Sequence, residues 1–276
     1  MKAVHFGAGK IGRADLLHDT GYEIVFVDVN EKVNEELNKY HNYYLYVIEE
    51  DYRRKEIDKV SALSPITEED KVVEAIVEAD VVTTAVLAKG LKARLEAGKE
   101  RVNVIPCENA LFNGDLLLKE LVKTEIASED DFLKAAAFPN TAVDRMVFGT
   151  DKDGRDGIDI GKDHELAVEV NKLVDPEKLP IAGAEYTDNL QKFLERKLYT
   201  INCGHAWSGY IGKLMGYEII QDYFAVPENI EMTREVMREV AALMVAKHGF
   251  TEKEMEDYIT FALNRFCTPG IKDTIT

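Results

Sequence analysis

A glycine-rich turn between an apolar strand and a helix limits the fold of this chain more than any other feature. Residues 2–6 form a short apolar run, and Gly7, Gly9 and Gly12 follow with the spacing GxGxxG. In a dinucleotide-binding turn the first glycine permits the tight bend, the second lets backbone approach a pyrophosphate, and the third lets the helix pack on the sheet. The free N–H groups at the helix start can then bind phosphate. Glycines also cluster in ordinary turns, but the flanking strand and helix favour a nucleotide site.

The same motif predicts which residues contact the cofactor. Asp28 ends the second expected strand, about 20 residues beyond the turn, where an acidic residue binds the adenosine ribose hydroxyls. A carboxylate at that position repels a 2′-phosphate, so the sequence favours NAD over NADP. The cofactor-binding residues expected from the motif are Gly7, Ala8, Gly9, Lys10, Ile11, Gly12 and Asp28.

The first half of the chain alternates between apolar runs and helical patterns. Unbroken runs rich in Val and Ile indicate strands buried on both faces, as in a parallel sheet covered by helices. This alternation predicts a doubly wound, Rossmann-type α/β fold. The expected strands are 2–6, 23–29, 80–87, 101–107 and 134–138, and the expected helices are 11–18, 30–40, 68–78 and 88–100. Segments 43–48 and 55–60 interrupt the pattern and predict an inserted antiparallel pair.

From about residue 185 the pattern becomes helical. Apolar residues recur at helical spacing in 228–248, which Gly249 ends, and 252–266 forms another helix. Thr187-Asp188 can cap a helix that runs to Lys197. The stretch 149–163 is rich in Gly and Asp and has little periodicity, so it is expected to contain the domain boundary. We therefore expect an NAD-binding domain over 1–150 and a mainly α-helical substrate and catalytic domain over 151–276.

The composition argues against several classes of function. With 51 acidic and 34 basic residues the formal net charge is −17, and such a surface repels nucleic acid and anionic membranes. No apolar run in the sequence approaches the ~20 residues that cross a bilayer. Met1-Lys2 leads directly into the first strand, so we expect no signal peptide and a cytoplasmic location. Cys107, Cys203 and Cys267 are scattered, which indicates neither a disulfide framework nor a zinc site.

The segment 197–205 gathers three polar side chains that suit proton transfer. At 100° per residue, Asn202 lies about 140° around a helix from Lys197, and His205 about 80°. All three therefore fit one sector of a helix that faces the same cleft. A lysine that is desolvated there has a lowered pKa and can exchange a proton near neutral pH. On spacing alone, a solvated lysine and a hydrogen-bonded structural histidine remain the alternative.

The pattern Lys-x4-Asn-x2-His, together with the N-terminal GxGxxG, resembles the polyol-specific long-chain dehydrogenases and reductases. The opening from His5 to Arg13 looks most like members that act on mannitol 1-phosphate. These motifs are specific in combination and not singly. Further segments similar to the family cover nearly the whole chain: Cys107-Glu108-Asn109, Pro139-Asn140-Thr141-Ala142-Val143-Asp144-Arg145, Thr187-Asp188-Asn189-Leu190, and Arg265-Phe266 with Pro269 and Asp273.

This resemblance implies an NAD-dependent, metal-independent oxidation of D-mannitol 1-phosphate to D-fructose 6-phosphate, and its reverse. Lys197 would be the general acid/base that takes the proton from the reacting hydroxyl. Asn109 and Asn202 would hold the developing alkoxide oxygen, and His205 would orient the substrate. Hydride would pass from C5 of the sugar phosphate to the nicotinamide. The loop that contains Ala85 would contribute to the cofactor site.

The resemblance also suggests substrate-binding residues and partners. Asp144, Arg145 and Arg265 match motifs near the cleft, although structural salt bridges fit Asp144 and Arg145 equally well. A guanidinium can bind phosphate through two hydrogen bonds, so Arg265 and Arg196 are candidates, with an ordinary surface position favoured for Arg196. The expected partner is a small-molecule sugar phosphate, and the chain is expected to be a monomer or homodimer.

Two other functions stay open. One is a related oxidoreductase that acts on an unphosphorylated polyol or a hexuronate, but such relatives usually carry extra residues before the first strand. The other is a non-catalytic NAD-binding protein, because a Rossmann domain alone does not specify chemistry. Such a protein would not need the set formed by Lys197, Asn202, His205 and Asn109.

The chain departs from the family pattern at three places. Ala14-Asp15 follows Arg13 where members continue with another glycine and an apolar helix turn. Ala88 follows Leu87 directly where members carry a loop, and the chain stops at Thr276 where members continue with further helices. We therefore expect the second domain to be incomplete and loop residues to be missing from the printed sequence. Real deletions would shorten the first helix and weaken NAD binding.

Overall fold

The computed structural model describes residues 1–8, 15–85, 87–152, 154–268 and 271–275. The chain divides into two compact units, Met1–Leu190 and Gln191–Thr276, and each is described by itself. This division falls later in the chain than the domain boundary expected at residue 150, and close to residue 185, where the sequence pattern becomes helical. No helix in the described ranges is long and apolar enough to span a membrane.

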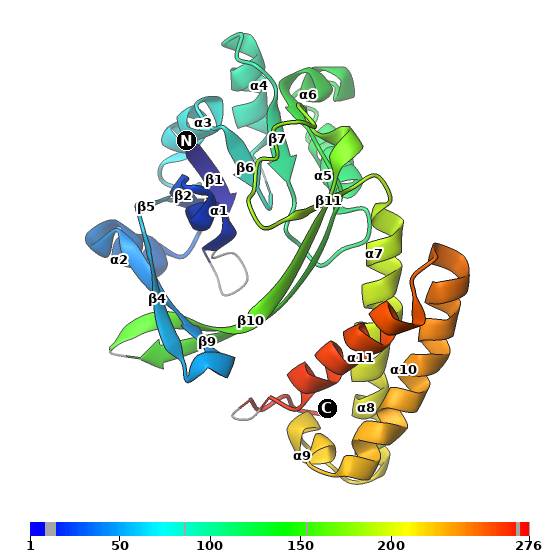
Figure 1. Cartoon of the computed structure of the whole chain (residues 1–276). Coiled ribbons are helices and arrows are strands. Elements are labelled where there is room, and N and C mark those ends of the chain that lie inside the picture. The colour runs from blue at the N-terminus through cyan, green and yellow to red at the C-terminus, as the bar shows by residue number, and fades with distance from the viewer. Residues whose placement is uncertain (9–14, 86, 153, 269–270, 276) are drawn as a thin grey trace. The chain divides into compact units, whose positions relative to one another are not determined.

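The first unit is built on a six-stranded parallel sheet, sheet A, whose strand order is β5-β2-β1-β6-β7-β8. With the inserted strands left out, this is the Rossmann order 3-2-1-4-5-6, which reverses direction between β1 and β6. The doubly wound fold predicted from the sequence is therefore confirmed (Figure 1). Its strands are β1 (Lys2–Phe6), β2 (Glu23–Val27), β5 (Val60–Leu63), β6 (Val81–Thr83), β7 (Val102–Ile105) and β8 (Ala136–Ala137).

Six α-helices belong to the first unit. Asn30 caps one of them, because its side chain accepts a hydrogen bond from the Val33 N–H at 3.4 Å. The expected strand at 134–138 is mostly wrong, since its first residues end a helix and only two residues join the sheet. The helices are α1 (Asp15–Thr20), α2 (Glu31–Tyr40), α3 (Glu69–Val77), α4 (Ala88–Glu96), α5 (Asn113–Lys123) and α6 (Glu129–Ala135).

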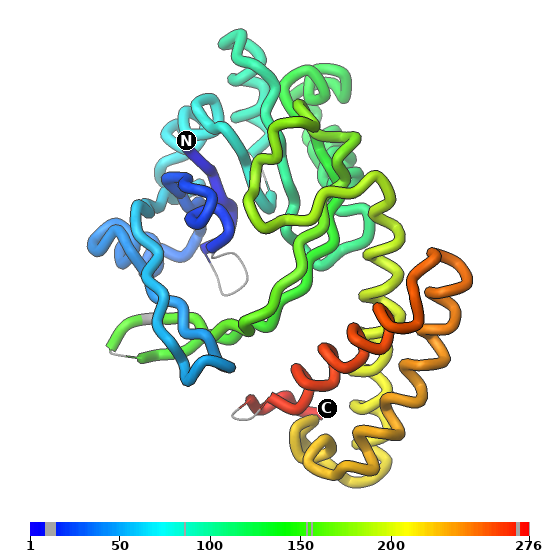
Figure 2. The backbone as a smooth tube through the Cα atoms, in the orientation of Figure 1, coloured from blue at the N-terminus to red at the C-terminus, as the bar shows by residue number. Residues whose placement is uncertain are grey.

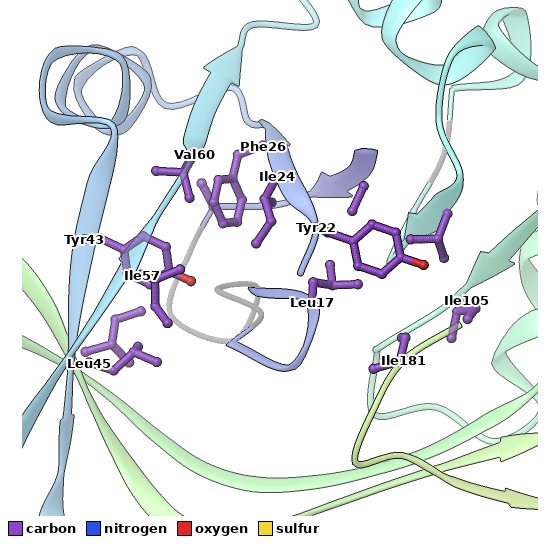
Figure 3. Close-up of a cluster of buried hydrophobic side chains, with 14 of the residues drawn as sticks. Leu17, Tyr22, Ile24, Phe26, Tyr43, Leu45, Ile57, Val60, Ile105 and Ile181 are labelled. Atoms are coloured by element: carbon purple, nitrogen blue, oxygen red, sulfur yellow. The ribbon is translucent and has the colours of Figure 1, made fainter. Parts of the chain in front are cut away.

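A second sheet, sheet B, has the order β11-β10-β3-β4, and β9 pairs with β10. The antiparallel pair expected at 43–48 and 55–60 is confirmed, with Asn42 opposite Asp58 and Val47 opposite Arg53. Figure 3 shows Tyr43 beside Ile57 in the hydrophobic cluster that the two sheets share. The strands are β3 (Asn42–Val47), β4 (Arg53–Asp58), β9 (Thr141–Lys152), β10 (Arg155–Glu169) and β11 (Glu185–Thr187), with short 3-10 helices η1 (Ile48–Glu50) and η2 (Val170–Lys172).

The turn chemistry expected for 149–163 is confirmed only at Gly154, which has φ 71° between β9 and β10, because the rest of the described stretch lies in the long antiparallel arms of these strands. Ile158 and Ile160 are buried at alternate positions, as a strand requires. Gly157, which suggested a turn, sits under the ring of Tyr46, where an added Cβ would come within 2.7 Å of Cε2. Here glycine reflects a close approach of side chain to backbone and not a break in the strand.

The second unit is helical, as predicted from about residue 185 onward. Its two longest helices match the expected ranges, with Gly249 left-handed at φ 68° after one and a Thr251–Glu254 capping box before the other. Figure 2 shows α10 running antiparallel beside α7 and α8. The helices are α7 (Leu190–Arg196, whose first residue belongs to the first unit), η3 (Lys197–Asn202, a π-helix), α8 (Cys203–Leu214), α9 (Ile220–Phe224), α10 (Pro227–His248) and α11 (Glu252–Phe266).

Candidate functional site

Gly7, the first glycine of the motif, follows β1 directly and has a conformation suited to a tight turn. Gly7 has φ +90°, a left-handed value that glycine adopts readily and other residues do not. Its N–H donates to the Val27 carbonyl at 2.8 Å, which joins the turn to β2. An added Cβ at Gly7 would meet nothing within 4 Å, so the requirement is for backbone conformation and not for space. The other expected turn residues Gly9, Lys10, Ile11 and Gly12 lie outside the described residues.

Asp28 lies at the carboxyl end of β2, beside this turn. Its Oδ2 accepts a hydrogen bond from the Ala8 N–H at 2.6 Å, and its Oδ1 accepts one from the Asn30 N–H at 2.8 Å. The Asn34 side chain donates to the Asp28 carbonyl at 2.7 Å, which ties this residue to α2. A carboxylate has about four lone-pair positions, so Asp28 can still accept two ribose hydroxyls. The structure thus brings Gly7, Ala8 and Asp28 together.

The carboxyl end of β6 is strained next to Ala85. Thr84 has φ 72°, which is unfavourable for a β-branched residue, and its N–H donates to the Ile105 carbonyl at 2.9 Å. Strain of this kind concentrates at functional sites. Because β6 neighbours β1, the bend lies at the point where the strand order of sheet A reverses. The strain at Thr84 could not be predicted from the sequence, since threonine is an ordinary residue at a strand end.

A buried histidine lies in β1, two residues before Gly7. His5 is 1% exposed, and its Nδ1 is 2.6 Å from the Thr83 hydroxyl oxygen. Its Nε2 has no hydrogen-bond partner among the described residues. Burial lowers the pKa of His5 to about 4, so the imidazole is neutral at physiological pH.

Asn109, the expected alkoxide ligand of the first unit, lies on the exposed loop after β7. Two buried side chains hold this loop: Thr141, which lies in the family-like segment 139–145, and Asn113, which the sequence did not single out. Asn113 donates through Nδ2 to the Glu108 carbonyl at 3.1 Å and to Thr141 Oγ1 at 2.7 Å. The Thr141 hydroxyl donates to the Pro106 carbonyl at 2.5 Å, and the Thr141 N–H donates to Asn113 Oδ1 at 2.9 Å. The contact between Asn113 and Thr141 could not be predicted from the sequence, which shows only that both side chains are polar and follow apolar strands.

The loop also contains Cys107, whose thiol donates to the Ile105 carbonyl at 3.6 Å. Burial raises the pKa of this thiol to about 12. Because the thiolate is the reactive form, Cys107 is not a nucleophile at neutral pH. Cys107, Cys203 and Cys267 are all free and partly exposed.

Arg145 forms an ion pair inside the first unit. Its Nη1 is 2.6 Å from Asp15 Oδ1 at the start of α1, and its Nε donates to the Gly161 carbonyl at 3.2 Å. Gly161 lies at the irregularity where the β9–β10 register shifts, so Arg145 also fixes this bulge. Lys55 approaches the other oxygen of Asp15 at 3.5 Å. Of the two roles left open for Arg145, this geometry supports the structural one, and Asp144 beside it is buried at 9% exposure.

In the second unit, Lys197 and Asn202 are the first and last residues of the π-helix η3. The α-helical positions predicted at 100° per residue are therefore wrong for this segment. A π-helix has i→i+5 hydrogen bonds, which bring residues five apart onto the same face. Lys197 and Asn202 are five residues apart, so they are better aligned than the prediction allowed. Lys197 is 7% exposed, whereas Asn202 is only partly buried.

His205 follows in the first turn of α8. Its Nε2 is 2.7 Å from Asp273 Oδ2, and its ring centroid is 5.5 Å from that of Phe266. A carboxylate partner on one ring nitrogen sets the orientation and tautomer of the imidazole. Asp273 was part of the family resemblance, but its pairing with His205 could not be predicted from residues that are far apart in the sequence.

The two candidate arginines of the second unit both lie over aromatic rings. The Arg265 guanidinium is 5.3 Å from the Phe261 ring centroid. Arg196 lies 5.0 Å from Phe193, 5.2 Å from Phe250 and 4.3 Å from Tyr258. The surface position favoured for Arg196 is wrong, because its guanidinium packs among these rings. In the described ranges, no group of three or more His, Cys, Asp or Glu side chains is arranged to hold a metal ion.

Two family models match the chain. The mannitol dehydrogenase Rossmann domain matches residues 1–176, and the mannitol dehydrogenase C-terminal domain matches residues 189–276. Among individual relatives, the mannitol-1-phosphate 5-dehydrogenase of Caldanaerobacter subterraneus subsp. tengcongensis is 35% identical over 296 aligned residues. That of Paenarthrobacter aurescens is 38% identical over 290 aligned residues. Each alignment covers 100% of this chain and 75% of the relative.

Two solved structures share the fold. A D-sorbitol dehydrogenase in substrate-free form superposes with a TM-score of 0.83 and 19% sequence identity. The match covers 100% of this chain and 71% of the sorbitol dehydrogenase chain. The second structure is the ternary complex of Pseudomonas fluorescens mannitol 2-dehydrogenase with NAD and D-mannitol. It has a TM-score of 0.79 and 20% identity, and the match covers 100% of this chain and 70% of the mannitol 2-dehydrogenase chain.

Proposed function

We propose that this chain, which belongs to the mannitol dehydrogenase family, oxidises D-mannitol 1-phosphate to D-fructose 6-phosphate with NAD. It would also catalyse the reverse reaction. The observation that carries this proposal is the buried Lys197 at the start of the π-helix η3, called the π-turn from here on, which aligns Lys197 with Asn202. Relatives 35% and 38% identical, both named mannitol-1-phosphate 5-dehydrogenase, support the phosphorylated substrate.

The residues of the first unit fit NAD. Gly7 and the Ala8 backbone would face the pyrophosphate, the Asp28 carboxylate would accept the ribose hydroxyls, and Ala85 lies on the neighbouring strand end. When bound, NAD supplies the hydride acceptor. Asp15 stands early in the helix after the turn, where a free carboxylate would repel the phosphates. Its ion pair with Arg145 offsets that charge, so this departure from the family pattern is compatible with NAD binding.

The second unit supplies the proton-transfer group. Lys197 takes the proton from the hydroxyl being oxidised, and a positioned acid or base of this kind contributes about 10²–10⁴-fold to the rate. The amides of Asn202 and Asn109 donate hydrogen bonds to the developing alkoxide oxygen. His205, oriented by Asp273, hydrogen-bonds a neighbouring hydroxyl of the substrate. None of these roles requires a metal ion.

The net charge of −17 makes a local cation necessary for a phosphorylated substrate. We assign Arg265 to that role, because its guanidinium can bind a phosphate through two hydrogen bonds. Arg145 is a weaker candidate because it is engaged with Asp15. A charged substrate of this kind does not cross a bilayer readily, which supports a cytoplasmic location. Whether the chain is a monomer or a homodimer stays a prediction.

A substrate screen tests this function. Initial rates with NAD and with NADP should be measured for mannitol 1-phosphate, mannitol, sorbitol 6-phosphate and hexuronates. We expect NAD reduction with mannitol 1-phosphate and a far lower rate with free mannitol or with NADP. Equal turnover of mannitol and its phosphate would overturn the phosphate specificity, and faster reduction of a hexuronate would favour a hexuronate oxidoreductase.

A further inference from the structure

Glu195, two residues before Lys197, is bound to the end of α10. Lys247 Nζ lies 2.8 Å from its Oε1 and 2.7 Å from its Oε2, and His248 Nε2 lies 2.7 Å from Oε2. Gln191 donates to Oε1 at 2.7 Å. The side chains of Glu195 and His248 are only 13% and 8% exposed, so the bond between them is largely shielded from water, whereas the Lys247 side chain is 47% exposed. Together the three partners lower the pKa of Glu195 to about 2, which keeps it charged.

A second contact with α10 lies just after the π-turn. An added Cβ at Gly204 would come within 2.8 Å of Met237 Sδ and 3.1 Å of its Cγ. Met237 is 0% exposed, and it lies in the middle of α10. The start of α8 therefore approaches α10 as closely as backbone allows. A larger residue at this position would have to displace the buried Met237 side chain, so glycine favours the close packing of α8 on α10.

These two contacts lie on the same neighbouring helix only because the segment between them is not α-helical. Nine residues separate Glu195 from Gly204, and at 100° per residue they would lie about 180° apart around an α-helix. An i→i+5 turn rotates less per residue than an α-helix, which brings Gly204 back toward the face of Glu195. The π-turn and the two α10 contacts therefore depend on one another.

Lys197 lies two residues after the first contact, and Asn202 lies two residues before the second. π-turns are rare, and a chain keeps one only where surrounding contacts hold it. If the first contact is lost, the segment can relax toward an α-helix, and the i→i+5 alignment of Lys197 with Asn202 is lost as well.

We propose that Glu195 is a positioning residue for the reaction, which holds the π-turn through Lys247 and His248 and thereby keeps the Lys197 amine aligned with the Asn202 amide. This role rests on the proposed function for Lys197. The Gly204–Met237 contact is the second support of the same turn.

The test replaces Glu195 with glutamine, which keeps its size and removes its charge. Misplacement of a catalytic group by about 1 Å costs about 10²-fold, so Glu195→Gln should lower kcat about 10- to 100-fold. The KM values for NAD and mannitol 1-phosphate should stay within about twofold, because binding is not the affected step. Glu231→Gln, on an exposed glutamate of α10 that pairs with Arg238, is the matched control and should leave kcat unchanged.

A suppressor pair tests the second support independently of Glu195. Gly204→Ala should lower kcat in the same way, because its new methyl group collides with Met237. Met237→Ala removes the atoms that collide, so the double variant should recover part of the lost kcat. If Glu195→Gln fails to fold, Lys247→Met removes only one of the partners of Glu195 and should give a smaller fall in kcat.

A measurement that needs no turnover separates this proposal from the proposed function. The rate at which an amine-reactive reagent labels Lys197, followed by peptide mass spectrometry across pH, reports the environment of its amine. Glu195→Gln should shift the pH midpoint of Lys197 labelling and leave that of the exposed Lys213 unchanged. An inactive wild type in which this shift still occurs would contradict the proposed function alone. An unchanged kcat together with an unchanged labelling midpoint would overturn the positioning role.

Discussion

Lys197 and His5 are both buried polar side chains, but their surroundings give them different roles. Lys197 is 7% exposed and begins a π-turn, with Asn202 at its other end. His5 is 1% exposed, and its side chain is hydrogen-bonded to the Thr83 hydroxyl. Sequence spacing pointed to Lys197 because three polar residues recur within one sector of a helix. No such pattern surrounds His5, since a single histidine inside an apolar strand fits a structural role.

Replacing Lys197 tests its role as the acid/base. Lys197→Ala should lower turnover of mannitol 1-phosphate by at least ~10²-fold, the usual contribution of a positioned proton-transfer group. NAD affinity, measured by fluorescence titration, should not change, because the cofactor residues lie on the first unit. Lys213→Ala, on an exposed lysine of α8, is the control. Wild-type turnover in Lys197→Ala would remove this residue from the mechanism.

His5 should make folding stability depend on pH. Its pKa is about 4 in the folded protein against 6.5 when unfolded, so below pH 6.5 the unfolded chain binds a proton that the folded chain does not. Stability is therefore full above pH 6.5 and falls as pH drops toward 4, by up to about 3 kcal/mol from this group. Urea unfolding at pH 7 and pH 4.5 should show a smaller loss for His5→Asn than for wild type. His41→Asn, at an exposed left-handed position that asparagine tolerates, should behave like wild type.

At the scale of elements, the sequence predicts those helices and strands that depend on local signals, and it misses those that depend on long-range contacts. The helices at 228–248 and 252–266 were predictable because Gly249 and Thr251 mark their ends by local chemistry. The β9–β10 arms were not predictable, because Gly157 resembles a turn residue in the sequence. In the structure this glycine is needed because the ring of Tyr46, which is distant in sequence, packs against it. The π-turn was not predictable either, since its i→i+5 bonds depend on contacts with α10 and have no residue signature.

The loop that carries Asn109 provides a test at this scale. Asn113→Ala would remove two donated bonds and one accepted bond in a buried setting, and each unsatisfied buried group costs about 1–3 kcal/mol. We expect the free energy of unfolding to fall by about 2–4 kcal/mol, measured by urea titration. Asn171→Ala, an exposed asparagine of η2 in the same unit, should change it by less than about 0.5 kcal/mol. If Asn113→Ala also lowered the free energy of unfolding by less than about 0.5 kcal/mol, the loop would be held by other contacts.

At the scale of the whole molecule, the proposed reaction draws on both units. The cofactor residues Gly7, Ala8 and Asp28 belong to Met1–Leu190, and the proton-transfer residues Lys197, Asn202 and His205 belong to Gln191–Thr276. The sequence predicted cofactor residues in the first domain and proton-transfer residues in the second, but it placed the domain boundary at residue 150, whereas strand β10 of sheet B continues to Glu169. The glycine turn indicated a cofactor, the segment 197–205 indicated a reaction, and only the family relationship indicated a substrate.

The most direct measurement of the central claim follows the hydride itself. Mannitol 1-phosphate carrying deuterium at C5 should be incubated with the protein and NAD, and both products should be analysed by mass spectrometry. The proposed reaction predicts equal amounts of unlabelled fructose 6-phosphate and deuterated NADH. Fructose 6-phosphate that retains the deuterium, or no NADH at all, would contradict it.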